Sequence, residues 1–312
     1  MKENNFAPIA IFTYNRPNHL KKTIEFLARN KNAINSILYI FSDGPKSVKD
    51  FDLVTEVRVL ISNVTGFKKV LIINSEYNLG LSRNVTLGIS HVLNFHDRVI
   101  VLEDDLITSI CFLDFMNKAL DLYQNDSNVC EIMGYSFVEK LADVKKIDST
   151  YFLRGGDSLG WATWKRAWKY YEESAEKLID QIKYKKLINS FNRNGSYDFF
   201  SMLKMQQEGK IDSWAIRWYA CTFLKNQLTL YPIKSLVLHI GNDGTGTNYN
   251  NHIKGNDPLN VSLFECEKYD FDKIEIIESR IGLQYYKKFL KSFEIGIFRK
   301  LAFKIKNIFY AK

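Results

Sequence analysis

The sequence has no apolar run close to the roughly 18 residues that a membrane-spanning helix needs. Its first residues lead almost directly into "PIAIFTYNRP" (8–17), without the charged, apolar and small-residue succession of a secretory signal peptide. We therefore expect a cytoplasmic protein that is made and kept on the inner side of the membrane.

Cysteine is scarce and scattered. The chain has four cysteines in 312 residues and no CxxC pair. Their spacing matches neither the disulfide framework of a small secreted domain nor a zinc site. The sequence therefore predicts reduced thiols at Cys111, Cys130, Cys221 and Cys266.

Common nucleotide-binding motifs are also missing. No GxGxxG follows the first predicted strand and no GxxxxGK[ST] occurs, which argues against dinucleotide-binding and P-loop proteins. A nucleotidyltransferase normally has a glycine-rich, basic loop after its first strand. The corresponding segment here, "TYNRPNHLKK", contains no glycine, so we rank that function last.

Positive charge is concentrated at one end of a chain whose net charge is +8. Residues 287–312 hold eight Lys or Arg and one Glu, with apolar residues at helical spacing between them. This pattern is typical of a basic amphipathic helix on an anionic membrane surface, and equally of a helix that packs on the core with a solvated lysine face. A nucleic-acid partner is not expected, because no recognition motif accompanies the patch.

Apolar strand-like runs alternate with amphipathic helices through the first half of the chain. This alternation predicts an α/β fold with a mainly parallel sheet flanked by helices. Asn15 is a candidate N-cap for the first helix. The predicted strands lie at 9–12, 37–42, 69–74 and 98–103, and the helices begin near 17, 50 and 80.

Three carboxylates, Glu103, Asp104 and Asp105, end the fourth strand. Side chains at the carboxyl ends of parallel strands meet at one edge of the sheet, so we expect Arg16 and Asp43 to lie nearby. Isolated acids in such a place cap a helix or are solvated. A hard divalent cation, Mn²⁺ or Mg²⁺, would relieve the repulsion among three acids and bring phosphate oxygens with it.

The second half of the sequence is richer in aromatic residues and less regular. We expect three parts: residues 1–140 as a nucleotide-binding half, 141–270 as the acceptor and catalytic half of the same domain, and 271–312 as the basic tail.

At this point the chain resembles a known family. "VLEDDL" is similar to the DxD-type motif of GT-A-fold glycosyltransferases, and the closer likeness is to the N-acetylglucosaminyltransferase I family and its bacterial family 2-like relatives. The likeness extends over roughly residues 8–250 and keeps the family's order. The segments that carry it are "YNRPNHLKKTIEFL", Asp43, "NLGLSRNVTLGISHVLN", "VLEDDL", "LGW" (159–161), "DSWAIRW" (212–218) and "SLVLHIGNDGTGTN" (235–248).

The resemblance implies a donor site for a nucleotide diphosphate sugar whose base would be uracil, with the following assignments. Asp105 would ligate the metal, with His239 as a further ligand or a structural residue. Glu103 and Asp104 would hold the ribose. The other donor-binding residues would be Asn15, Arg16, Asp43, Arg83 and Asn84, although some relatives carry His at the last position.

The resemblance also implies an acceptor side. Gly160, Trp161 and Trp214 would line it, and Asp212 would be the catalytic base that deprotonates the acceptor hydroxyl, with inversion at the anomeric carbon. Relatives carry an acid shortly after the tryptophan, where this chain has Ala215, so Asp212 as a helix cap and Asp157 as the base stay open.

The segment 241–248, "GNDGTGTN", matches a loop that closes over the donor in the relatives. The sequence thus predicts a metal-dependent glycosyltransferase of bacterial surface polysaccharide or glycoconjugate synthesis. Its partners would be a nucleotide-sugar donor, a glycan or lipid-linked saccharide acceptor, and an anionic membrane surface contacted by the tail. The alternative is a non-catalytic nucleotide- or sugar-binding protein that retains the fold.

Overall fold

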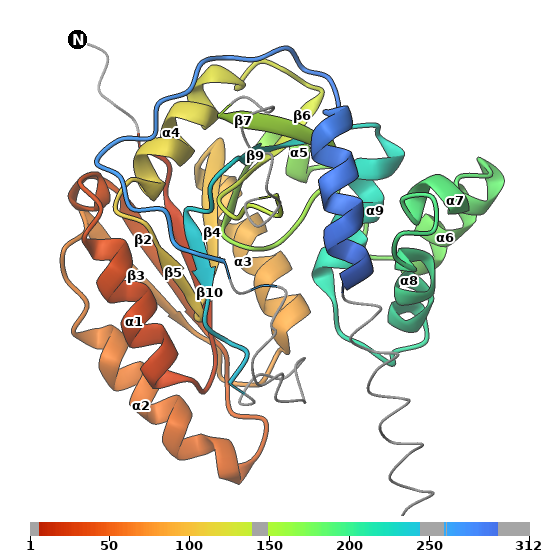
Figure 1. The fold of residues 1–312 in the computed structure, drawn as a ribbon. Coiled ribbons are helices and arrows are strands. Elements are labelled where there is room, and N and C mark those ends of the chain that lie inside the picture. The colour runs from red at the N-terminus through yellow and green to blue at the C-terminus, as the bar shows by residue number, and fades with distance from the viewer. Residues whose placement is uncertain (1–5, 139–148, 244–258, 260, 293–312) are drawn as a thin grey trace, which may run out of the picture.

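The computed structural model describes residues 6–138, 149–243, 259 and 261–292. Its centre is an eight-stranded sheet with the order β3-β2-β1-β4-β8-β6-β9-β7, and a two-stranded sheet, β10-β5, lies beside it (Figure 1). The strands are β1 Ile9–Thr13, β2 Ile37–Ser42, β3 Lys69–Asn74, β4 Arg98–Glu103, β5 Leu106–Thr108, β6 Val129–Met133, β7 Thr150–Arg154, β8 Trp161–Trp164, β9 Leu228–Pro232 and β10 Val237–His239.

The longer helices alternate with the first strands as the sequence predicts. Two short 3₁₀ turns, Ala33–Asn35 and Val48–Asp50, join them. The helices are α1 Pro17–Ala28, α2 Phe51–Ser62, α3 Leu81–Phe95, α4 Phe112–Leu122, α5 Lys165–Trp168, α6 Ala175–Tyr184, α7 Ile188–Phe191, α8 Phe199–Gln207 and α9 Trp214–Leu224, followed by a C-terminal helix at 280–292.

The prediction of a mainly parallel sheet flanked by helices is confirmed. β1 pairs in parallel with β2 and β4, β2 with β3, and β6 with β9, while β8 enters antiparallel between β4 and β6 and β7 pairs antiparallel with β9. The strand period of two divides the core into two layers. Ile9 and Ile11 pack with α1, α2 and α4, whereas Ala10 and Phe12 pack with α3 and the second half of the chain.

A glycine lets α3 lie close against the sheet. A Cβ on Gly88 would stand 2.4 Å from Cε1 of Phe12, which is far inside van der Waals contact. The close approach fixes α3 over β1, and its first turn thereby comes to the carboxyl edge of the sheet.

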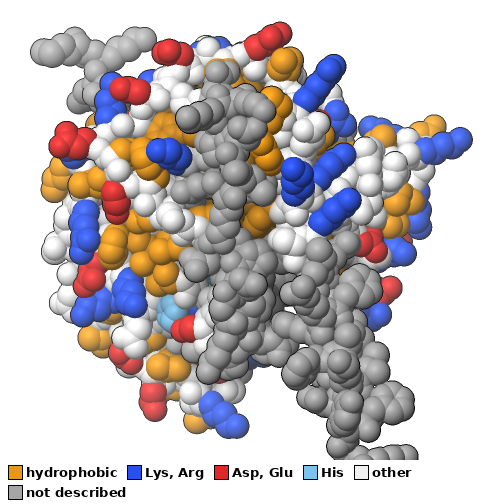
Figure 2. All heavy atoms as spheres, in the orientation of Figure 1, with side chains coloured by type: hydrophobic (Ala, Val, Ile, Leu, Met, Phe, Trp, Pro, Cys, Tyr) orange, Lys and Arg blue, Asp and Glu red, His pale blue; other side chains and the backbone are white. Residues whose placement is uncertain are grey.

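The C-terminal segment crosses the outside of α4 and then packs on the core (Figure 1). Phe115 of α4 contacts Tyr269 and Phe271, with ring centroids 5.1 and 4.9 Å apart. In the helix 280–292, Tyr286 and Phe289 pack on Phe137 at 4.9 and 4.8 Å. Figure 2 shows Lys and Arg side chains gathered around this helix. Residues 280–292 therefore follow the core-packing alternative.

The rest of the basic tail, residues 293–312, lies outside the described residues, and so does most of the predicted loop 241–248. Among the helices that the structure describes, none has the length and apolar character needed to cross a membrane.

The prediction of four reduced cysteines is wrong for two of them. Cys111, just before α4, forms a disulfide with Cys266, 155 residues later in the chain, while Cys130 and Cys221 are buried free thiols. Sequence spacing gave no sign of this bond, because the C-terminal segment reaches Cys111 only through its packing over α4. The cytoplasmic location loses the support that reduced thiols had given it.

We predict that the disulfide stabilises the fold by roughly 2–4 kcal/mol, because it closes a long loop in the unfolded chain. Denaturant unfolding with and without a reducing agent measures this. The wild-type protein should lose that stability on reduction, and Cys266→Ser should start from the lower value and not respond. A Cys221→Ala control should still respond. Equal stability of the oxidised and reduced wild type would contradict the prediction.

Candidate functional site

The three acids that end β4 lie at the carboxyl edge of the sheet, beside the turn that follows β1. Asp104 is buried, and its Oδ2 accepts hydrogen bonds from Thr13 Oγ1 at 2.9 Å and Tyr14 N at 3.3 Å. Its backbone oxygen accepts from Thr23 Oγ1 of α1 at 2.7 Å. Burial and the charge of Asp105 raise the pKa of Asp104 to about 7. Asp104 therefore joins β4 firmly to the β1–α1 turn.

Asp105 lies beside an arginine and a histidine from two distant segments. Its Oδ2 is 2.7 Å from Arg16 Nη1, at the start of α1, and 3.4 Å from His239 Nε2, at the end of β10. The antiparallel pairing of β10 with β5 sets His239 opposite Leu106, next to Asp105. Burial raises the pKa of Asp105, but the hydrogen bonds and charges of His239 and Arg16 outweigh it and hold the pKa below its ordinary value.

Glu103, the first acid, faces the second half of the chain. Burial and the charges of Asp105 and Asp104 raise its pKa to about 8, while a hydrogen bond with Trp214 of α9 acts in the opposite direction. The three neighbouring acids thus differ in charge near neutral pH. Asp105 is ionised, and Glu103 is mostly protonated, so the repulsion between them is small.

Asp105 and His239 together offer two donor atoms of the kinds that divalent cations bind. One carboxylate oxygen and one imidazole nitrogen face each other, which is a donor set that Mn²⁺ accepts, and the remaining positions would go to phosphate oxygens and water. Nδ1 of His239 is buried without a hydrogen-bond partner in the described part of the chain. A Cβ on Gly241 would lie 2.1 Å from Asp105 Oδ2 and 2.8 Å from His239 Nε2, so only glycine leaves this space open.

The protein ligands for such a cation are few. Within the described residues, no group of three or more His, Cys, Asp or Glu side chains is arranged to hold a metal ion. The site would therefore depend on its substrate for further ligands, as is usual for metals that bind with phosphates.

Asp43, which follows β2, is occupied by the chain itself. Its Oδ1 accepts from the backbone N of Gly44 and Leu79, both at 2.8 Å, and its Oδ2 accepts from Gly80 N at 3.0 Å and Asn78 Nδ2 at 3.1 Å. These bonds fold residues 78–80 over the end of β2. A contact of Asp43 with a nucleobase would have to share or replace one of them.

Asp212 lies at the first turn of α3 rather than capping its own helix. Its Oδ2 accepts from Ser82 N at 3.2 Å, while Ser213 caps α9 by accepting from Ile216 N. Arg217 reinforces the joint by donating to Ser82 Oγ. Asp212 is exposed, so its carboxylate is accessible from solvent. The prediction that Asp212 is a helix N-cap is therefore wrong, because Ser213 takes that position in α9 and Gly80 takes it in α3.

The other predicted donor residues differ in accessibility. Arg83 is exposed on α3 and Asn84 is buried beside it. Asn15 is not the N-cap of α1. That position is taken by Arg16 without a side-chain cap, and Asn15 Nδ2 instead donates to Asp50 Oδ1 at 3.2 Å. The 3₁₀ turn at Val48–Asp50 places the carboxylate of Asp50 next to the side-chain amide of Asn15, which therefore points away from the helix.

The predicted acceptor-side residues lie below the surface. Trp161 and Trp214 are 0% and 2% exposed and stack at 5.2 Å between ring centroids. Gly160 adopts φ +65°, and a Cβ there would stand 2.7 Å from Val237. The two indoles are buried, and Trp214 contacts Glu103. Neither indole could contact a sugar unless the residues that cover it moved.

A buried acid on the neighbouring strands escaped the sequence reasoning. Glu131 of β6 is fully buried, where burial raises its pKa well above the ordinary value, and it accepts from Trp218 Nε1 and from Asp157 N at 2.9 Å. The only signal was a charged residue inside the apolar strand "VCEIM". Burial raises the pKa of Asp157, the alternative base, to about 6.

The sequence reasoning also missed two site residues near Arg16, namely His19 and Asp243. His19 Nε2, one turn further along α1, lies 3.1 Å from Asp243 Oδ2. Arg16 Nη2 itself lies 3.3 Å from Gly241 O. The spacing of Arg16 and His19 on one helix face was visible in the sequence, but their partners were not.

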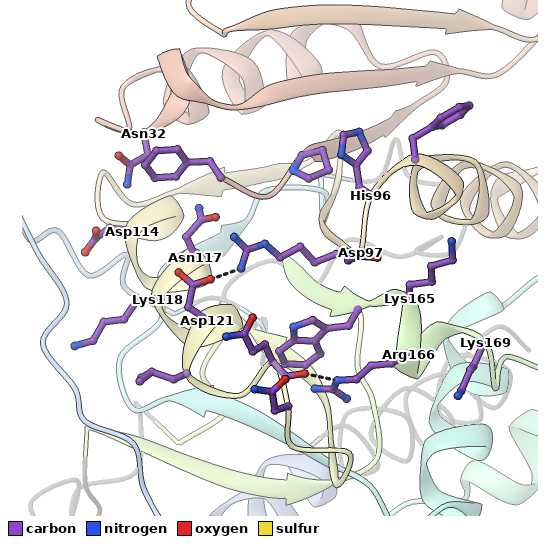
Figure 3. A pocket seen from close by; sticks show the side chains of 18 of the residues that line it. Asn32, His96, Asp97, Asp114, Asn117, Lys118, Asp121, Lys165, Arg166 and Lys169 are labelled. Atoms are coloured by element: carbon purple, nitrogen blue, oxygen red, sulfur yellow. Dashed lines mark hydrogen bonds and ion pairs between the residues drawn. The ribbon is translucent and has the colours of Figure 1, made fainter. Parts of the chain in front are cut away.

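A groove of about 1210 Å³ lies at the opposite edge of the sheet (Figure 3). Its charged groups are largely used by the protein: Arg98 pairs with Asp121, Lys118 donates to Phe271 O, and Arg166 donates to three backbone carbonyls. It does not include the acids that end β4 and is not the candidate site.

No protein-family model and no curated protein matches the sequence. Among solved structures, a mannosyltransferase from Pyrobaculum calidifontis in complex with GDP-Man and Mn²⁺ is 10% identical, with 57% of this chain and 46% of that chain covered and a TM-score of 0.37. The galactosyltransferase LgtC, in complex with donor and acceptor sugar analogues, is 11% identical; the match covers 72% of this chain and 86% of that chain, with a TM-score of 0.36. TarS from S. aureus is 12% identical; the match covers 40% of this chain and 20% of that chain, with a TM-score of 0.29. At these TM-scores the similarity assigns neither substrate nor metal to this chain.

The raised pKa of Glu103 predicts that stability falls as pH rises. The side chain ionises near 4.3 when unfolded and at about 8 when folded, so the native state binds more protons between these values. The contribution of Glu103 to the free energy of unfolding is therefore complete below about pH 4 and is lost progressively as the pH rises to about 8. Between these values the free energy of unfolding falls by at most about 1.4 kcal/mol per pH unit from this group.

Glu103→Gln should remove that part of the slope, which urea unfolding at pH 5 to 9 would measure. Glu265→Gln, on the C-terminal segment, serves as a matched control that should keep the wild-type slope. An unchanged slope in Glu103→Gln would show that Glu103 is already ionised in the folded protein.

Proposed function

We propose that this chain is a metal-dependent glycosyltransferase, which moves a sugar from a nucleotide diphosphate sugar, with uracil as the expected base, to a hydroxyl of a glycan or lipid-linked saccharide. The observation that carries the proposal is the meeting of Asp105, Arg16 and His239 at the carboxyl edge of a parallel sheet. This is the place where α/β proteins bind their ligands. The order of motifs along the chain supports the same function.

The donor side uses the chain's own groups in separate roles. Asp105 and His239 hold Mn²⁺ or Mg²⁺, which, when bound, supplies positive charge to the departing diphosphate. Glu103 and Asp104 accept hydrogen bonds from ribose hydroxyls. Burial and the neighbouring acids raise the pKa of Glu103 to about 8, and in its protonated form it also donates.

Asp212 is our candidate for the base that takes the proton from the acceptor hydroxyl. It is exposed at the joint of α3 and α9, two residues before Trp214, whose indole reaches Glu103. A carboxylate base opposite the leaving group gives inversion at the anomeric carbon. Arg83 and Asn84, at the same first turn of α3, are proposed to complete the nucleotide pocket.

A second function, a non-catalytic nucleotide- or sugar-binding protein, is favoured by two observations. Asp212 already accepts a hydrogen bond from Ser82 N, and position 215 is alanine where relatives carry an acid. Turnover separates the two functions, because a binding protein would hold donor without cleaving it.

We also propose that the protein works on the inner face of the cell membrane in surface polysaccharide or glycoconjugate synthesis. The support is the composition of residues 287–312, with eight basic residues and one acid. Since residues 280–292 pack on the core, residues 293–312 would make the contact with anionic lipid.

Asp105→Asn should lower donor turnover with Mn²⁺ by at least about 100-fold, because loss of charge stabilisation at a leaving group typically costs this much. The measurement is release of UDP from UDP-sugars, with and without acceptor. Asp97→Asn is the matched control: it removes an exposed acid at the opposite end of the same strand and should keep wild-type turnover. UDP binding without turnover in wild type and both variants would instead establish the binding protein.

Charge reversal in the tail tests the membrane contact. Lys304→Glu combined with Lys306→Glu should reduce pelleting with vesicles containing phosphatidylserine by roughly 10-fold or more, since each basic residue contributes about 1 kcal/mol near an anionic surface. Neutral phosphatidylcholine vesicles are the reference. Equal pelleting of wild type and variant with anionic vesicles would exclude the tail as the contact.

A further inference from the structure

Arg16 joins three groups that come from two different segments. Its Nη1 donates to Asp105 Oδ2 at 2.7 Å, and its Nη2 donates to Gly241 O at 3.3 Å and lies 3.5 Å from Asp243 Oδ1. The side chains of Arg16 and Asp105 are 12% and 13% exposed. One guanidinium therefore holds both the candidate metal ligand and residues 241–243 against the start of α1.

The same segment is held by a second contact from α1. His19 Nε2 lies 3.1 Å from Asp243 Oδ2. Burial and the nearby Arg16 lower the pKa of His19, so at neutral pH it holds Asp243 mainly by a hydrogen bond. Of the two α1 residues that hold residues 241–243, Arg16 is thus the one that contributes a positive charge.

A divalent cation and Arg16 compete for one oxygen. A metal held by Asp105 Oδ2 and His239 Nε2 would bind both atoms directly. Arg16 Nη1 already lies 2.7 Å from that oxygen, and a cation bound to the same oxygen would repel the positively charged guanidinium. Because both positive groups would share this oxygen, cation binding and the Arg16–Asp105 pair oppose each other.

We propose that Arg16 is a latch that the cation opens. In the cation-free protein it pairs with Asp105 and ties residues 241–243 to α1. Cation binding displaces it, frees those residues from α1, and releases a guanidinium beside the cation, where it pairs with the diphosphate of the arriving nucleotide. The inference rests on the proposed function, because it takes the Asp105 site as the metal site.

Two affinities test the latch, because removing Arg16 should change them in opposite directions. The first is the affinity for Mn²⁺ alone, which is measured from the electron paramagnetic resonance signal of free Mn²⁺ during a titration. The second is the affinity for UDP at saturating Mn²⁺, which is measured by calorimetry. Arg16→Ala should bind Mn²⁺ about 10-fold more tightly than wild type and UDP about 10-fold more weakly.

Two further variants keep the result interpretable. Arg16→Gln preserves a polar side chain of similar length in case the alanine variant does not fold, and it should shift both affinities in the same directions. Arg29→Ala removes an arginine from the other end of α1, where it is exposed, and should leave both affinities at wild-type values.

The other outcomes overturn the latch in distinguishable ways. If Asp105→Asn abolishes Mn²⁺ binding but Arg16→Ala binds the ion as well as or less well than wild type, the latch is wrong and the metal site stands. If neither the wild type nor any variant binds Mn²⁺ at millimolar concentration, the latch and the proposed metal dependence fail together.

Discussion

The structure depends on how three neighbouring carboxylates are accommodated at the end of one buried strand. Each is stabilised differently: Asp104 by hydrogen bonds from the β1–α1 turn, Asp105 by Arg16 and His239, and Glu103 by a raised pKa and by Trp214. These partners come from three segments of the chain: residues 13–16, His239 and Trp214. The charge at the end of β4 therefore organises the edge of the sheet around it.

This arrangement also connects the two halves of the chain. Glu103 reaches α9 through Trp214, and α9 returns to α3 through Asp212 and Ser82. The first turn of α3 is in turn shaped by Asp43, which binds residues 78–80. A ligand that changes the charge at the end of β4 would thus act, through Trp214 and α9, on the contact between α9 and α3 where the proposed acceptor base lies.

Local patterns were enough to place much of the first half. The runs 37–42, 69–74 and 98–103 are strands β2, β3 and β4, because apolar residues bounded by polar turns leave few alternatives. The convergence of Arg16 and the three acids followed from parallel topology alone. Asn15, by contrast, was expected to cap α1, and its amide is taken by Asp50, which local sequence does not reveal.

What the sequence could not supply are contacts between residues far apart. The Asp212–Ser82 bond spans 130 positions and the Cys111–Cys266 disulfide spans 155. Neither leaves a periodic signal, because each depends on packing of whole elements. The accommodation of Glu131 in the core is of the same kind, since only its three-dimensional neighbours show how a buried acid is satisfied.

The most direct test is a crystal structure of the protein with Mn²⁺ and UDP, recorded to give anomalous scattering from manganese. The account predicts an anomalous peak between Asp105 Oδ2 and His239 Nε2, with the diphosphate on its open side and Arg16 moved from the carboxylate. An intact Arg16–Asp105 pair with no peak at that position, in crystals where UDP is bound elsewhere, would contradict it.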